Sequence, residues 1–221
     1  MLIAENISKR YFRKTGQANY FEAVQPLSLT LAPGAVTVLT GRSGSGKTTL
    51  LHMLSGLLTP STGRVTLAGA DLYALSDRDL SRLRSEKIGV VPQARSAVDS
   101  LTVLENILLP GRLYGREIKI ETAEKWMDEM DILPLRDDRP AALSGGELRR
   151  MAIARVLAQD SPVILADEPT GDLDGENTRR VLTILRDAAH REGKAVFLVT
   201  HESDALSYAD AAYQMDGGRL R

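Results

Sequence analysis

The stretch that decides the fold is Gly41-Arg42-Ser43-Gly44-Ser45-Gly46-Lys47-Thr48-Thr49. It follows an apolar run at residues 36–40 and precedes a run of helical character that begins at Leu50. The pattern G-x-x-x-x-G-K-[ST] between a strand and a helix is that of a phosphate-binding loop. Its glycines let backbone N–H groups turn toward an anion, and the helix N-terminus adds a favourable dipole. We therefore expect a nucleoside triphosphate, with Lys47 at the β- and γ-phosphates and Thr48 as a ligand of Mg²⁺.

A second apolar run, at residues 163–166, ends in the carboxylates Asp167 and Glu168. Ligands of an open parallel sheet gather at the carboxyl ends of its strands, so we expect Asp167 to face the Mg²⁺, through water. Glu168 is expected to polarise a water in line with the γ-phosphate, which favours hydrolysis. Two alternatives stay open: acidic residues that simply end a strand, and a kinase that passes the phosphoryl group to a bound acceptor.

The hydrophobic pattern predicts an α/β fold. Apolar runs at 36–40, 88–91, 163–166 and 195–200 are typical of buried parallel strands. Residues 63–69 alternate between glycines like an antiparallel strand, and residues 94–155 are mostly helical. We predict one domain, 1–221, with a P-loop NTPase (RecA-like) core, a mainly parallel sheet and an antiparallel β subdomain. The core takes in about 1–93 and 156–221, and about 94–155 form an inserted helical subdomain.

Composition excludes several classes of site. The 221 residues contain no cysteine and three histidines, which rules out thiolate sites and makes a histidine metal cluster improbable. A balance of 28 basic and 29 acidic side chains argues against a broad nucleic-acid-binding surface. Apolar runs stay short of the ~18 residues that a membrane span needs, and the start does not read as a signal peptide. We expect an intracellular protein.

A second phosphate-binding helix start is indicated by Leu143-Ser144-Gly145-Gly146-Glu147, which precedes a helical stretch at 148–158. On local grounds Ser144 and Glu147 form a capping box. Two glycines in a first helical turn cost about 1 kcal/mol each relative to alanine, and they leave bare N–H groups open to a large anion. Capping alone is the alternative explanation.

With these three motifs the chain resembles an ATP-binding-cassette ATPase subunit, over nearly its whole length. The resemblance implies that two subunits stack head to tail, so that each ATP lies between one phosphate loop and the other chain's signature loop. Ser144, Gly145, Gly146 and Glu147 are then expected to bind the γ-phosphate of the partner's nucleotide.

The same resemblance assigns roles to four further residues. Gln93 matches the glutamine that approaches Mg²⁺ and the attacking water, and it begins the lobe that contacts a membrane partner. Asp172 and Asp174 match a loop that crosses the dimer interface, although Asp174 also suits the N-cap of the next helix. His201 matches a histidine that touches the γ-phosphate and orients Glu168. Gln93 and His201 also have structural alternatives, a solvated loop glutamine and a strand-end histidine.

Tyr11 stands where the family has an aromatic side chain that stacks on adenine. Such stacking contributes roughly 1 kcal/mol and discriminates bases loosely. Phe12, Tyr20 and Phe21 are rivals for the role. The single tryptophan, Trp126, is expected in the core of the helical lobe rather than in a docking surface.

The family resemblance favours a transporter motor over a soluble machine that acts on DNA or ribosomes. The resemblance is strongest to the branch that includes macrolide-exporter, lipoprotein-releasing, cell-division, and antimicrobial-peptide or haem efflux ATPases. It implies ATP and Mg²⁺ as cofactors, a homodimer, and a permease contacted through the Gln93 loop and the helical subdomain. The expected location is the cytoplasmic face of the cell membrane.

Overall fold

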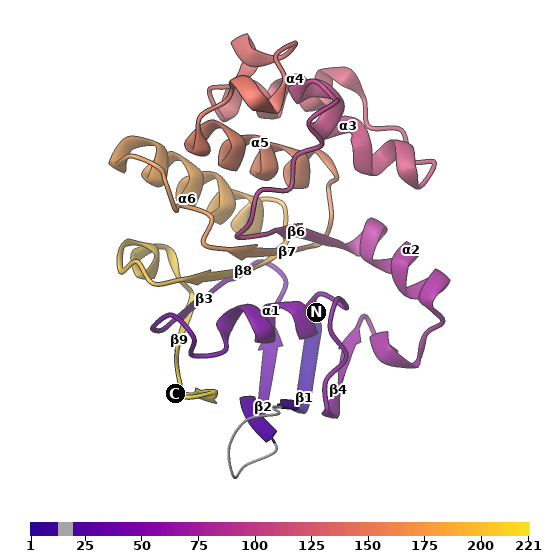
Figure 1. Ribbon diagram of the computed structural model, residues 1–221, viewed down its shortest axis with the longest axis vertical. Coiled ribbons are helices and arrows are strands. Elements are labelled where there is room, and N and C mark those ends of the chain that lie inside the picture. Colours follow the sequence, from indigo (N-terminus) through magenta and orange to yellow (C-terminus); the bar gives the residue numbers. More distant parts are fainter. Residues whose placement is uncertain (13–19) are drawn as a thin grey trace.

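The computed structural model describes residues 1–12 and 20–221, which form two β-sheets with helices between and outside them (Figure 1). The strands are β1 (Leu2–Phe12), β2 (Tyr20–Leu31), β3 (Val36–Thr40), β4 (Thr62–Leu67), β5 (Ala70–Asp71), β6 (Ile88–Val91), β7 (Val163–Asp167), β8 (Ala195–Thr200), β9 (Ala211–Asp216) and β10 (Arg219–Leu220). The α-helices are α1 (Lys47–Leu54), α2 (Asp77–Lys87), α3 (Val103–Leu113), α4 (Ile120–Glu129), α5 (Gly145–Ala158) and α6 (Gly175–His190). Short 3₁₀ turns cover Leu72–Ala74, Leu133–Leu135, Pro140–Ala142 and Asp204–Tyr208.

The larger sheet has the strand order β10-β9-β3-β8-β7-β6, and all its pairs are parallel except that of β10 with β9. All four predicted parallel strands are present. Successive residues of these strands enter two different cores: Ile164 packs with the helices of one face, and Leu165 packs on the other. Both faces are therefore buried, which explains why the strands read as continuous apolar runs.

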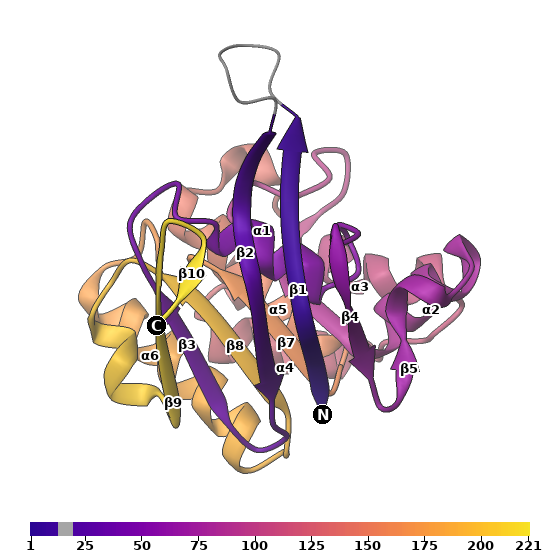
Figure 2. The same ribbon diagram turned by 90° about the horizontal axis from the view of Figure 1, so that it is seen from below.

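The smaller sheet is antiparallel, with the order β2-β1-β4-β5, as the alternation at 63–69 predicted. It lies across the parallel strands, and helix α1 packs between the two sheets (Figures 1 and 2). The leucines of α1 belong to the same core as β1 and β2. Helix α1 begins directly after the phosphate loop, so this packing fixes the loop against both sheets.

Helices α5 and α6 cover the opposite face of the parallel sheet, and α3 and α4 stack on α5 (Figure 1). Every residue predicted on the inner face of α6 is buried: Thr178, Val181, Leu182, Leu185, Ala188 and Ala189. Trp126 of α4 is partly buried against the helical core, as expected. Helices α3 and α4 and most of α5 fall within residues 94–155, and the division into subdomains stays a prediction.

Across residues 1–12 and 20–221, the helices lack the combination of length and apolar character that a membrane crossing requires.

Candidate functional site

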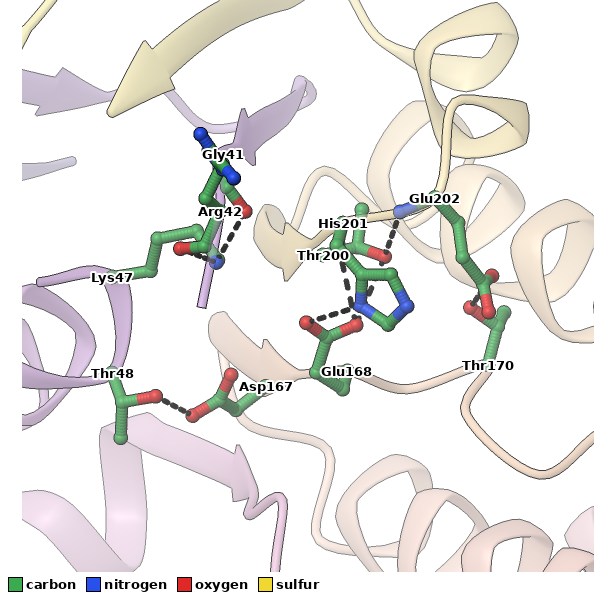
Figure 3. A network of polar contacts seen from close by, with 10 residues as sticks. All are labelled: Gly41, Arg42, Lys47, Thr48, Asp167, Glu168, Thr170, Thr200, His201 and Glu202. Carbon is green, nitrogen blue, oxygen red and sulfur yellow. Dashed lines mark hydrogen bonds and ion pairs between the residues drawn. The ribbon is translucent and has the colours of Figure 1, made fainter. Parts of the chain in front are cut away.

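The phosphate loop joins β3 to α1, and close backbone contacts require glycine at Gly41 and Gly46. Gly46 has φ 107°, and a Cβ built there would lie 2.2 Å from the carbonyl oxygen of Ala23 on β2. Lys47 is buried, and its Nζ donates to the carbonyl oxygens of Gly41 (2.6 Å) and Arg42 (3.1 Å) (Figure 3). The ammonium group therefore lies across the mouth of the loop, where an incoming phosphate would meet it.

Thr48 and Asp167 bring the loop and the end of β7 together. The Thr48 hydroxyl donates to Asp167 Oδ2 over 2.7 Å (Figure 3). Burial raises the pKa of the Asp167 carboxyl, the hydrogen bond from Thr48 opposes that shift, and the neighbouring Glu168 charge adds to it. A cation at this point would relieve the cost of burying the carboxylate.

Glu168 follows Asp167 with φ 51°, in the left-handed region that a non-glycine residue rarely adopts. Its carboxylate points toward the end of β8, where Oε1 lies 2.9 Å from Nδ1 of His201 and Oε2 accepts from the Thr200 hydroxyl at 3.1 Å (Figure 3). The hydrogen bond to Glu168, and then its charge, raise the pKa of His201. The carboxylates of Asp167, the last residue of β7, and of Glu168, which follows it, thus face different partners.

These residues share one cavity of about 710 Å³. It is lined by Tyr11, Phe21, Ala23, Arg42, Ser43, Gly44, Gly46, Lys47, Thr48, Thr49, Gln93, Asp167, Glu168 and His201. Tyr11 and Phe21 are cross-strand partners on β1 and β2 and both face the cavity, whereas Phe12 and Tyr20 do not line it. Gly41 and Ser45 complete the loop without lining the cavity, and the hydroxyl of Ser45 is buried without a partner in the described part of the chain.

The remaining predicted residues lie around a second hollow of about 690 Å³, which shares no lining residue with the first. Ser144, Gly145, Gly146, Glu147, Asp172 and Asp174 line it, together with Asp131, Arg150, Leu173 and Asn177. The predicted capping box is confirmed: Glu147 Oε2 accepts from the Ser144 N–H (2.7 Å) and hydroxyl (2.8 Å). These bonds lower the pKa of Glu147, so its carboxylate is charged at neutral pH. Asp174 is the N-cap of α6, as anticipated.

Helix α5 holds the loop that carries Gln93. The guanidinium of Arg149 donates to the carbonyl oxygens of Pro92 (2.7 Å) and Gln93 (2.8 Å). Arg155, one helical turn and a half further along, donates to the Ser96 carbonyl oxygen (2.9 Å) and hydroxyl (2.5 Å). The helix whose N-terminus lines the second hollow is therefore bonded directly to the wall of the first cavity.

Comparison with known families decides the identity. Residues 24–171 match the family model described as ABC transporter. The chain belongs to this family. It is an ATP-binding-cassette ATPase, as the motifs predicted.

Relatives of the cassette include the macrolide export ATP-binding/permease protein MacB of Chlorobaculum tepidum, 36% identical over 219 residues. That alignment covers 99% of this chain and 33% of the relative, so the chain spans about a third of MacB. An uncharacterized ABC transporter ATP-binding protein of Mycobacterium tuberculosis is 37% identical over 202 residues, which cover 90% of this chain and 81% of the relative.

Solved cassettes share the whole fold. The dimeric structure of a bacterial ABC transporter cassette has a TM-score of 0.92 and 30% identity, and it covers 100% of this chain and 98% of the other. A dimeric post-hydrolysis state of that cassette, bound to ADP and Pi, gives the same values.

The donor set of the cassette fits a magnesium ion. Thr48 and Asp167 present a hydroxyl and a carboxylate oxygen within hydrogen-bonding distance, and Mg²⁺ prefers oxygen ligands. The described residues contain no group of three His, Cys, Asp or Glu side chains that could enclose a metal. An ion here would take its remaining ligands from phosphate and water.

Several residues of the cassette's sites were not anticipated. Phe21 was considered only as a rival of Tyr11, although the pairing of two aromatic residues across a hairpin is a signal for a shared wall. Arg149 and the residues around Thr200 carried no motif of their own. Their positions depend on contacts between elements far apart in the sequence.

Proposed function

We propose that two copies of this cassette close head to tail on two ATP molecules, each held between the phosphate loop of one copy and the Ser144 loop of the other. One observation carries the proposal. The chain presents two phosphate-suited helix starts in two separate hollows, and each hollow holds only half of the predicted residues. A second copy supplies the missing half of each site, in keeping with the dimeric structures of the related cassette.

In this arrangement Lys47 would leave the loop carbonyls and pair with the β- and γ-phosphates. Thr48, Asp167 and Gln93 would hold Mg²⁺, which neutralises charge that develops on the phosphates. Glu168 would accept a proton from the attacking water. The water oxygen would bond to the γ-phosphorus while the bond from that phosphorus to the β–γ bridging oxygen breaks, and ADP would leave. His201 would turn to the γ-phosphate, and Tyr11 with Phe21 would pack against the base.

We place the cassette at the cytoplasmic face of the membrane, where closure and reopening drive a separate permease. The Gln93 loop and the helices of residues 94–155 form the proposed contact. Similarity to MacB supports export, and mechanical work across the membrane without cargo is the related possibility within this branch. The relatives are transporter components, which supports a membrane partner over DNA or ribosomes.

A complementation experiment tests the composite site. Lys47→Ala disables the phosphate loop in the first cavity, and Ser144→Phe blocks the second hollow. In a head-to-tail dimer, a mixed pair contains one site with both lesions and one site with neither. We therefore expect ATP hydrolysis from a mixture of the two variants and almost none from either variant alone.

The control is each variant mixed with an unlabelled preparation of itself, at the same total concentration. Sedimentation of fluorescently labelled chains with ATP shows whether mixed pairs form. If mixed pairs form and hydrolysis stays at the level of the single variants, ATP does not lie between the two half-sites and the proposed arrangement is wrong.

A further inference from the structure

The Glu168 carboxylate has three hydrogen-bond partners: the side chains of Thr200 and His201, which differ in kind, and the backbone N–H of His201, which donates to Oε2 over a longer 3.4 Å. Thr200, at the end of β8, is 1% exposed and donates its hydroxyl to Oε2 over 3.1 Å. His201 contacts Oε1 at 2.9 Å, but its side chain is 66% exposed. A buried strand-end hydroxyl keeps one position, whereas an exposed imidazole is free to change rotamer.

The direction of the Thr200 hydroxyl is fixed by a further bond. The backbone N–H of Glu202 donates to Thr200 Oγ1 over 3.0 Å. That bond occupies an acceptor position of the oxygen, and the hydroxyl's one proton is directed to Glu168 Oε2 (Figure 3).

A second threonine stabilises the segment from Thr200 to Glu202. Thr170, three positions from Asp167 and 1% exposed, donates its hydroxyl to Glu202 Oε2 over 2.5 Å. Because Thr170 lies on the segment that follows β7, the bond ties the two strand ends together beside Glu168 (Figure 3). The left-handed backbone of Glu168 is held in the same place by its N–H bond to the Val199 carbonyl oxygen (2.8 Å).

We propose that Thr200 is the positioning residue for Glu168: it holds Oε2 while Oε1 is left for the attacking water, with Glu202 and Thr170 fixing its hydroxyl. The inference rests on the proposed role of Glu168 as the base. When His201 turns to the γ-phosphate, Oε1 loses its partner and Oε2 keeps the Thr200 bond. A base held at one oxygen has one orientation toward the water, and misplacing a reacting group by about 1 Å costs on the order of 100-fold in rate.

The test compares Thr200→Val with Thr200→Ser. Valine has the shape of threonine without the hydroxyl, and serine keeps the hydroxyl. We expect Thr200→Val to lower kcat by about 10- to 100-fold with KM for ATP within about twofold, and Thr200→Ser to stay within about threefold of the parent. ATP-driven dimer formation, followed by sedimentation, should persist in both variants, since neither change touches a phosphate contact.

A double variant separates positioning from a general structural role. Thr200→Val added to Glu168→Gln should cause no further loss of turnover, because Thr200 acts through the carboxylate. A further tenfold loss, a normal kcat in Thr200→Val, or equal losses for valine and serine would overturn the inference. Near-normal hydrolysis by Glu168→Gln alone would instead show that the proposed base is wrong.

Discussion

At the scale of single residues, the contact between Glu168 and His201 has a measurable electrostatic signature. The hydrogen bond to Glu168 is the main cause of the raised His201 pKa, and the Glu168 charge is the second. The imidazolium is thereby favoured before nucleotide arrives. In the proposed cycle, the γ-phosphate would be the competing anion that draws His201 away from Glu168.

We predict that an NMR titration of the His201 ring gives a midpoint above the usual 6.5, and that Glu168→Gln returns it toward that value. The pKa of His201 is higher in the folded than in the unfolded protein. The contact between His201 and Glu168 therefore stabilises the fold fully below about pH 6.5, and this stabilisation is lost as pH rises through the folded-state pKa. Glu121→Gln, which removes an exposed carboxylate on α4, serves as the control. An unchanged midpoint in Glu168→Gln would show that the two side chains do not interact in solution.

At the scale of elements, Asn106 attaches the segment after the Gln93 loop to α3. This side chain is fully buried. Its Oδ1 accepts from the Val98 N–H (2.8 Å), and its Nδ2 donates to the carbonyl oxygens of Val98 (3.1 Å), Leu101 (3.2 Å) and Thr102 (2.9 Å). One amide therefore satisfies backbone groups along a turn that has no regular structure.

We expect Asn106→Ala to lower the free energy of unfolding by about 2–4 kcal/mol, because it leaves buried backbone groups without partners. The matched change is Arg95→Ala, which removes an exposed ion pair with Asp99 from the same segment and should cost less than about 1 kcal/mol. Denaturant unfolding compares the two. Equal losses would mean that the segment does not depend on Asn106.

Elements with a strong local pattern were predictable, and elements defined by distant contacts were not. The buried strands, the inner face of α6 and the caps Ser144 and Asp174 follow from periodicity and capping rules. Strand β9 was not foreseen, because its residues Ala211–Asp216 mix polar and apolar side chains without a clear alternation. Its parallel neighbour is β3. Thr200 and Thr170 were missed for a similar reason, since an isolated threonine carries no signal until the fold brings its partner near.

At the scale of the whole molecule, the motifs predicted the residues of the two hollows, and the family resemblance predicted that Ser144 serves the partner's nucleotide. In the structure Ser144 and Lys47 line different hollows, and neither motif alone shows how far apart the packing of α5 and α6 on the sheet places them. The proposed permease contact lies on the helical side, away from the antiparallel sheet (Figure 1).

Because the sequence lacks cysteine, introduced thiols give unambiguous cross-linking sites. We predict that a photo-cross-linker on Val98→Cys, whose parent side chain is 40% exposed, attaches to an integral membrane polypeptide in native membranes. The same reagent on Thr30→Cys, an exposed position of the antiparallel sheet, should not. Mass spectrometry identifies the cross-linked polypeptides and so tests the proposed contact. Products with ribosomal proteins, or membrane products from Thr30→Cys alone, would contradict the proposed contact.

The two hydrogen bonds of the Arg149 guanidinium have a mechanical consequence. These two bonds join the N-terminal half of α5 to the backbone at Pro92 and Gln93. In the proposed dimer, a rotation of that helix by the neighbouring copy would move Gln93 beside this copy's own nucleotide. Each chain would therefore sense, through the guanidinium groups of Arg149 and Arg155, what happens in the opposite half of the pair.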